Sequence, residues 1–308
     1  MKIQHIESKR LPCVWTALIT PLLPDGTVDF NSLSNIARAQ EEAGNGILLL
    51  GSTGEGLALS EQEQLAVVHH VCQLALSVPI MVAVGGYQLA VQERWIQACN
   101  ELRVSAYLLA TPLYAKPGPS GLTQWFSTLL DCAKHPCMLY NVPSRSGVNI
   151  PVSTVQQLQN HPNCWAMKEA SGDLATFLSY KQHCPEIALF SGEDAMMPYL
   201  AGAGVEGLVS VSANAWPKET RAYVEKALRN EHHGLFPVWQ NAVDALFQVA
   251  NPIPVKVLMK EKGMIASATL RAPLTEHEIP KNHQLQQVDQ LIENWFSENH
   301  QQVIGVQS

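Results

Sequence analysis

The sequence predicts an α/β protein built as a closed (β/α)8 barrel, the TIM-barrel architecture, with a C-terminal helical region. Eight short apolar runs recur at intervals of roughly 20–33 residues, and a segment with helical spacing of apolar residues follows each run. No linker or low-complexity segment interrupts the first 230 residues, which favours one domain. A doubly wound open sheet would produce the same alternation and is the main competitor.

The strands are expected at continuous apolar runs, because parallel strands covered by helices are buried on both faces. In chain order these runs are CVWTALIT (13–20), GILLL (46–50), PIMVAVG (79–85), AYLLA (106–110), CMLY (137–140), CWAMK (164–168), IALFS (187–191) and GLVSV (207–211).

Helices are expected between these runs, where apolar residues recur with a helical period. The segments are 32–44, 60–75, 91–102, 121–134, 151–160, 174–184 and a stretch around 195–204. Ser60 and Glu63 form a capping-box pattern at the start of the second segment. Gly44 and Gly46 suit the end of the first helix and the turn into the next strand.

The chain changes character after about residue 232, where helix-like segments follow one another without intervening strands. They cover residues 231–250, 251–263 and 283–296. We therefore expect a catalytic barrel over residues 1–232 and a helical region over residues 233–308 that packs on the barrel.

Composition excludes several classes of partner. The net charge is −7 and no run of basic residues occurs, so nucleic acid is not an expected partner. The longest apolar runs are too short to span a bilayer, and MKIQHIESKR lacks the apolar core of a secretory signal. The seven cysteines include no CxxC pair, which is typical of free thiols in a reducing compartment. We expect a cytoplasmic protein that does not bind membranes.

In a barrel the active site lies where strands end, and the sixth run, in WAMKEASGD, ends at Lys168. One interpretation is that the apolar stem packs while the ammonium reaches solvent or a carboxylate. The other is a desolvated amine, neutral enough to attack a carbonyl and form a Schiff base. The neighbouring Glu169 points to the opposite face of the strand and is expected to be structural.

Other strand ends carry polar groups that could serve the same chemistry. Ser52 and Thr53 lie in GSTGEG, Tyr114 lies in TPLYAKPGP, and Tyr140 and Arg145 lie in YNVPSRSG. A tyrosine beside an iminium can move the protons that convert it to an enamine, and an arginine suits bidentate binding of a carboxylate. Read one at a time, these residues also fit a tight turn, a packing tyrosine and a surface arginine.

Several other kinds of site are not indicated. No Gly-x-Ser-x-Gly elbow and no phosphate-binding glycine loop occurs, and the histidines have no metal-ligand spacing such as HExxH. We expect no metal site. No strand is followed by the full glycine fingerprint of a nucleotide-binding dehydrogenase.

GSTGE, TPLYAKP, YNVPSR, KEASGD and NPIPVK, in this order and spacing, resemble the dihydrodipicolinate synthase family of pyruvate-dependent class I aldolases, in the N-acetylneuraminate lyase superfamily. The resemblance runs from ALITPLLPDGTVD to TLRAPLT. It implies a barrel with a helical C-terminal region, assembled as a homotetramer of tight dimers. The implied reaction joins pyruvate to L-aspartate 4-semialdehyde in the diaminopimelate pathway to lysine.

The resemblance also implies roles for individual residues. Lys168 would form the Schiff base with pyruvate, and no other cofactor would be needed. Tyr140 would be the proton shuttle, and Ser52 would relay protons between Tyr140 and Tyr114, which would reach into the neighbouring subunit's site.

The remaining implied roles concern substrate binding. Thr53 and the backbone near Val209 would bind pyruvate, with Thr53 at its carboxylate, and Gly192 would line the pocket. Arg145 would hold the carboxylate of the aldehyde.

Two features bear on the branch of the superfamily. Arg145 and NPIPVK look like the synthase, whereas a serine in the first hydroxyl position of GSTGE looks like the sugar-acid lyase. Serine keeps the hydroxyl, so the arginine weighs more, and a sugar-acid aldolase using the same lysine is the alternative. A non-catalytic member that binds a keto acid would be expected to lack Lys168 or Tyr140, and both are present.

One departure from the family concerns feedback inhibition. Lysine-inhibited members place charged and polar residues in a pocket at the dimer interface, and the corresponding positions here carry few such groups. We therefore expect weak or absent inhibition by lysine. These positions are Gly56, Leu57, Glu61, Gln64, Tyr87, Val91 and Leu113.

Overall fold

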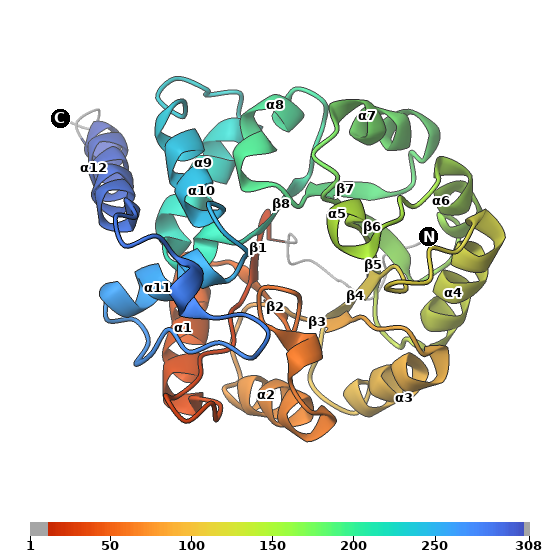
Figure 1. Cartoon of the computed structure of the whole chain (residues 1–308). Coiled ribbons are helices and arrows are strands. Elements are labelled where there is room, and N and C mark those ends of the chain that lie inside the picture. The colour runs from red at the N-terminus through yellow and green to blue at the C-terminus, as the bar shows by residue number, and fades with distance from the viewer. Residues whose placement is uncertain (1–11, 305–308) are drawn as a thin grey trace.

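Eight parallel strands close into a barrel in the computed structural model, which describes residues 12–304 (Figure 1). The strands follow one another around the barrel in chain order, and the last pairs with the first. This confirms the predicted fold class. The segment MKIQHIESKR, in which we expect no secretory signal, lies outside the described residues.

Each strand overlaps one predicted apolar run. The strands are β1 (Val14–Ala17), β2 (Gly46–Leu49), β3 (Ile80–Val84), β4 (Ala106–Ala110), β5 (Cys137–Asn141), β6 (Cys164–Glu169), β7 (Ala188–Ser191) and β8 (Gly207–Ser210).

The α-helices surround the barrel and continue into the C-terminal region. They are α1 (Phe30–Ala43), α2 (Glu61–Gln73), α3 (Leu89–Cys99), α4 (Pro119–Cys132), α5 (Pro143–Ser146), α6 (Val152–Leu158), α7 (Leu174–His183), α8 (Met197–Ala201), α9 (Pro217–Leu228), α10 (Val238–Leu246), α11 (Ile253–Glu261) and α12 (Leu285–Ile304).

The predicted helix signals form as expected. The Ser60 backbone N–H donates to the Glu63 carboxylate over 2.9 Å, and the Glu63 N–H donates back to the Ser60 hydroxyl, so α2 begins with a complete capping box. Gly44 ends α1 with a left-handed φ of 72°. These two signals fix the helices on either side of β2.

The core has two layers, which assign a face to each strand residue. One buried cluster fills the barrel, and the other lies between the barrel and its helices. On β6, Ala166 belongs to the inner cluster and Met167 to the outer one. Since side chains alternate along a strand, Lys168 lies on the inner face and Glu169 on the outer face.

The C-terminal helices lie on one side of the barrel, beside α9 and α1 (Figure 1). Trp239 of α10 stacks on Tyr223 of α9 with ring centroids 4.2 Å apart, and it meets Trp295 of α12 edge to face at 5.2 Å. The predicted helix over residues 231–250 is wrong at its start, because Gly234 has a φ of 79° and Pro237 precedes the first helical turn. The boundary at residue 232 stays a prediction.

Candidate active site

Lys168 lies at the carboxyl end of β6, directly opposite Tyr140 of β5 in the parallel register. Its side chain is 6% exposed. The Lys168 Nζ lies over the Tyr140 ring, 4.4 Å from the ring centroid, and among the described residues no carboxylate forms an ion pair with it. A buried ammonium with no carboxylate within ion-pair distance is uncommon, which argues against the purely structural interpretation of this lysine.

Glu169 takes part in a separate network behind the strand. Its carboxylate accepts hydrogen bonds from the Asn141 side chain at 2.7 Å and from the Ser171 backbone N–H at 2.6 Å. Burial raises the pKa of Glu169, and these hydrogen bonds oppose that effect. Glu169 therefore holds β5 and β6 together, in agreement with the structural role expected for it.

Gly192 follows β7 and packs against the stem of Lys168. A Cβ atom at this position would lie 2.8 Å from the Lys168 Cε and 2.5 Å from the Ala170 Cβ. The Gly192 N–H donates to the Glu169 backbone carbonyl over 2.7 Å. A side chain at residue 192 would displace the lysine, so glycine is required for this lysine position.

The segment after β2 turns sharply and carries two of the predicted hydroxyls. Gly56 folds back on the end of the strand, since a Cβ there would lie 2.0 Å from the Leu50 carbonyl oxygen. The resulting turn leaves Ser52 exposed to the cavity described below and buries Thr53 to 3% exposure. The Thr53 hydroxyl accepts a hydrogen bond from the Asn251 side chain at 3.0 Å.

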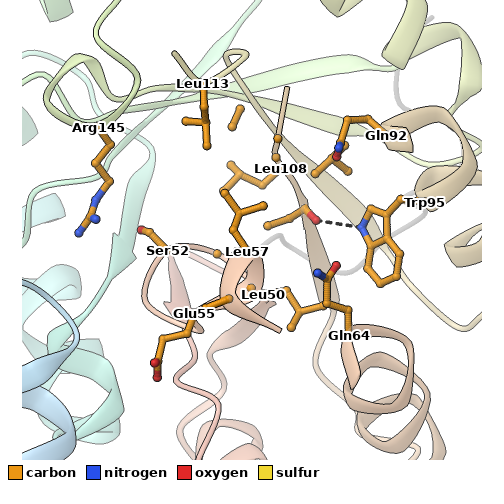
Figure 2. A pocket seen from close by; sticks show the side chains of 18 of the residues that line it. Leu50, Ser52, Glu55, Leu57, Gln64, Gln92, Trp95, Leu108, Leu113 and Arg145 are labelled. Carbon is orange, nitrogen blue, oxygen red and sulfur yellow. Dashed lines mark hydrogen bonds between the residues drawn. The ribbon is translucent and has the colours of Figure 1, made fainter. Parts of the chain in front are cut away.

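A cavity of about 710 Å³ opens beside the barrel mouth and brings three predicted residues together. Ser52, Tyr140 and Arg145 all line it. Figure 2 shows Arg145 and Ser52 along the same side of this cavity. On the opposite wall, the Trp95 indole N–H donates to the Ala83 carbonyl at 3.1 Å.

The other predicted residues do not line this cavity. Lys168 lies against Tyr140, which does line the cavity, and Gly192 packs against the stem of Lys168. Val209 is fully buried in the inner cluster beside Trp15, its partner on β1. Tyr114 is 91% exposed and has a φ of 71°, outside the cavity. Within one chain, Tyr114 is therefore not brought to the other candidate groups.

The sequence reasoning missed Glu193, which directly follows Gly192. Burial raises the pKa of Glu193 to about 7; Asp194 acts in the same direction, while Lys168 and Arg145 oppose it. Because the charges of Lys168 and Arg145 both act on it, Glu193 is a further candidate residue for this site. Its position at a strand end was the signal that could have identified it.

Asp194 is a second missed residue, and it ties two strand ends together. Its carboxylate accepts hydrogen bonds from the Ser210 hydroxyl at 2.5 Å and from the backbone N–H groups of Val211 and Ser212 at 3.0 and 3.1 Å. This fixes the loop after β8, next to Val209, relative to the loop after β7.

Within residues 12–304, no group of three or more histidine, cysteine, aspartate or glutamate side chains is arranged to hold a metal ion. None of the helices in this range combines the length and apolarity needed to cross a bilayer.

Comparison with known proteins agrees with this arrangement. The sequence model of the Dihydrodipicolinate synthetase family matches residues 11–294. The 4-hydroxy-tetrahydrodipicolinate synthase of Francisella philomiragia is 49% identical over 285 residues, which are 92% of this chain and 97% of that protein.

Solved structures with this fold are similar over nearly their full length. The dihydrodipicolinate synthase of Acinetobacter baumannii, described as a complex with pyruvate, is 30% identical with a TM-score of 0.84, covering 93% of this chain and 99% of that one. The enzyme of Cyanidioschyzon merolae, described with lysine bound, is 28% identical with a TM-score of 0.85, covering 92% and 98%. The chain belongs to the dihydrodipicolinate synthetase family.

Proposed function

We propose that this protein is a 4-hydroxy-tetrahydrodipicolinate synthase, which condenses pyruvate with L-aspartate 4-semialdehyde through a Schiff base on Lys168. One observation carries the proposal: a lysine on the inner face of the barrel, 6% exposed, lies over the Tyr140 ring, and no carboxylate of the described residues lies within ion-pair distance of its ammonium. The relatives that bear this enzyme name support the choice of reaction.

The first half of the reaction makes a carbon nucleophile. The Lys168 amine adds to the C2 carbonyl of pyruvate, and loss of water leaves an iminium ion. The iminium draws electrons from the neighbouring C3 methyl, so removal of a C3 proton gives an enamine. Tyr140 would move these protons, and the position of its ring beside the Lys168 Nζ supports this role.

The second half uses the enamine and releases the enzyme. The C3 carbon attacks the aldehyde carbon of the second substrate, whose oxygen becomes a hydroxyl. The amino group of that substrate then adds to C2 and displaces Lys168, which closes the ring. One water is released overall, and no oxidant or cofactor is consumed.

Binding of the two carboxylates is assigned to different residues. Arg145 lines the cavity and can hold the aldehyde's carboxylate with two parallel N–H bonds. Thr53 would bind the pyruvate carboxylate, with the backbone near Val209 and Gly192 completing that end of the site. The relative described as a complex with pyruvate supports this class of substrate.

Assays with alternative aldehydes test the assignment. The purified protein should turn over pyruvate with L-aspartate 4-semialdehyde and show no turnover with the aldehyde sugar that a sialic acid lyase would use. Turnover with the sugar alone would instead establish the sugar-acid aldolase alternative. An inactive result with both, together with failure to form a pyruvate adduct, would contradict any aldolase function.

The same proposal includes a homotetramer in the cytoplasm. Tyr114 and Leu57 are 91% and 62% exposed, which suits residues that contact a neighbouring subunit. Ser52 would then relay protons between Tyr140 and the neighbour's Tyr114. None of the seven cysteines forms a disulfide, which supports a reducing compartment. Sedimentation velocity of the purified protein measures the assembly directly.

A further inference from the structure

Two segments that are almost 200 residues apart in the sequence meet behind the candidate site. The Asn251 side-chain amide donates a hydrogen bond to the Thr53 hydroxyl at 3.0 Å. Both side chains are buried, at 6% and 3% exposure. In Figure 1 the blue C-terminal segment reaches the orange segment that follows β2.

A buried ion pair joins the same two segments. Lys256 of α11 and Glu55 form an ion pair at 0% and 3% side-chain exposure. The Glu55 carboxylate also accepts the Arg271 backbone N–H at 2.7 Å, and the Lys256 ammonium also donates to the Thr269 carbonyl at 3.0 Å. Glu55 also lines the cavity, and Figure 2 shows its carboxylate on the side away from Trp95 and Gln64.

The surroundings of this ion pair affect both the backbone conformation of Glu55 and the pKa of Lys256. Glu55 has a left-handed φ of 52°, a conformation that a non-glycine residue holds only when its surroundings enforce it. Burial lowers the pKa of Lys256, and the neighbouring Glu55 opposes that effect. A buried ion pair contributes little net stability, but removal of one partner leaves an uncompensated charge in the interior. Thr53 therefore lies in a turn that is anchored from the C-terminal region at two points.

The Asn251 contact determines what the Thr53 hydroxyl can do. A threonine hydroxyl has one proton to donate and two lone pairs that accept. Because the Asn251 N–H occupies a lone pair, the Thr53 proton is free to be donated elsewhere. A hydroxyl with a free proton is suited to bind a carboxylate, because a carboxylate only accepts hydrogen bonds.

We propose that Asn251 is a positioning residue that directs the Thr53 hydroxyl proton to the carboxylate of the keto-acid substrate, and that the Lys256–Glu55 pair holds the two segments in place. This inference rests on the proposed function, since it assigns Thr53 to pyruvate. It gives the C-terminal region a part in binding the first substrate.

Asn251→Asp tests the direction of the hydrogen bond, because aspartate has nearly the same shape but can only accept. The Thr53 proton would turn toward residue 251 and away from pyruvate. We expect the KM for pyruvate to rise about tenfold, equivalent to about 1.4 kcal/mol, while the KM for the aldehyde stays within about twofold. An unchanged KM for pyruvate would overturn the proposal. Asn251→Ala, which removes the donor without adding charge, replaces this variant if it folds poorly.

A double-mutant cycle with Thr53→Val separates this effect from simple charge repulsion. If Asn251 acts through the Thr53 hydroxyl, Asn251→Asp should add little to the KM for pyruvate once that hydroxyl is gone. Fully additive effects would contradict the proposed path through Thr53.

The role proposed for the Lys256–Glu55 ion pair is tested by comparison with a second ion pair in the C-terminal region. Lys256→Met should raise the KM for pyruvate. Lys262→Met removes a less buried ion pair with Asp289 that does not touch the loop after β2, and it should leave that KM unchanged. Equal KM values in the two variants would overturn this part.

If Lys256→Met does not fold, the double variant Glu55→Gln/Lys256→Met removes the stranded charge and serves in its place. Borohydride trapping of pyruvate on Lys168 in the unsubstituted protein keeps the two claims distinct. If the adduct forms but the Asn251 variants bind pyruvate normally, only the positioning role fails. If the unsubstituted protein forms no adduct, the proposed function itself fails.

Discussion

At the scale of single residues, the contact between Lys168 and Tyr140 combines two uses of one side chain. The ring faces the ammonium at 4.4 Å, and the hydroxyl is assigned to proton transfer. An aromatic face attracts a cation, so the ring can hold the lysine in place even without the hydroxyl. A substitution that removes the Tyr140 hydroxyl but keeps the ring can therefore separate proton transfer from the positioning of Lys168.

Tyr140→Phe should lower kcat at least about 100-fold, the usual contribution of a general acid or base, while the melting temperature changes little. Tyr107→Phe is a matched control, because its buried hydroxyl donates to Asn100 at 2.9 Å outside the inner cluster. That control should cost about 1 kcal/mol of stability and leave kcat unchanged. Equal kcat values for Tyr140→Phe and the unsubstituted protein would remove Tyr140 from the reaction.

Glu193 predicts a pH-dependent stability. Its pKa is raised from 4.5 to about 7 in the folded protein, mainly by burial and by Asp194. The protonated form is therefore favoured by folding, and its stabilising effect is present below pH 4.5 and lost as the pH rises through about 7.

Glu193→Gln cannot ionise, so this variant should gain stability relative to the unsubstituted protein between pH 5 and pH 8, by up to about 3 kcal/mol. Thermal unfolding of both proteins across this range measures the effect. Melting curves that stay parallel with pH would show that Glu193 is not perturbed.

Some features of the site depend only on neighbouring residues in the sequence, whereas others depend on contacts between distant segments. Strand alternation was enough to place Lys168 and Glu169 on opposite faces of β6, because a period of two depends only on neighbours in the chain. The Asn251 contact with Thr53 depends on how distant segments pack, and NPIPVK has no local period that points to GSTGE. The roles of the site residues remain predictions.

At the scale of elements, the strand–loop unit of β7 makes room for the lysine of β6. Gly192→Ala places a methyl group 2.8 Å from the Lys168 Cε and should displace that side chain. We expect most of the activity to be lost and about 1–3 kcal/mol of stability, the usual effect of overpacking.

Gly202→Ala is the control for this substitution, because a Cβ there meets nothing within 4 Å. It should leave both activity and the melting temperature close to those of the unsubstituted protein. A fully active Gly192→Ala variant would show that Lys168 tolerates a shift in position.

The barrel strands could be predicted because burial on both faces requires continuous apolar runs, as in GILLL and AYLLA. Helix ends were predictable where a local signal exists, as at Ser60. The start of α10 was not predicted, because the apolar period continues through a segment that Gly234 and Pro237 prevent from being helical. Where local signals conflict in this way, the ends of helices in the C-terminal region cannot be predicted from the sequence.

At the scale of the whole molecule, the 710 Å³ cavity extends from the candidate site to a wall on α2 and α3 that carries both apolar and polar side chains. Leu57, Gln64, Val91 and Leu113 line it at positions where lysine-inhibited relatives are expected to carry polar groups. Glu61 is the one acidic side chain among the positions compared, and lysine would need partners for two ammonium groups and a carboxylate.

We therefore expect L-lysine at about 1 mM, a concentration corresponding to a binding free energy near −4 kcal/mol, to leave the condensation rate unchanged. Initial rates with and without lysine at fixed pyruvate give the answer. Strong inhibition at or below this concentration would show that the cavity binds lysine through other groups. A lysine-inhibited synthase assayed in parallel controls for the method.

The central claim is that Lys168 forms a Schiff base with pyruvate, and borohydride trapping tests it most directly. Incubation of the full-length protein with pyruvate and sodium borohydride should add the mass of one reduced pyruvate per chain. Peptide mass spectrometry should locate that mass on Lys168, and Lys168→Arg should abolish it. An unmodified protein, or an adduct on a different lysine, would contradict the account.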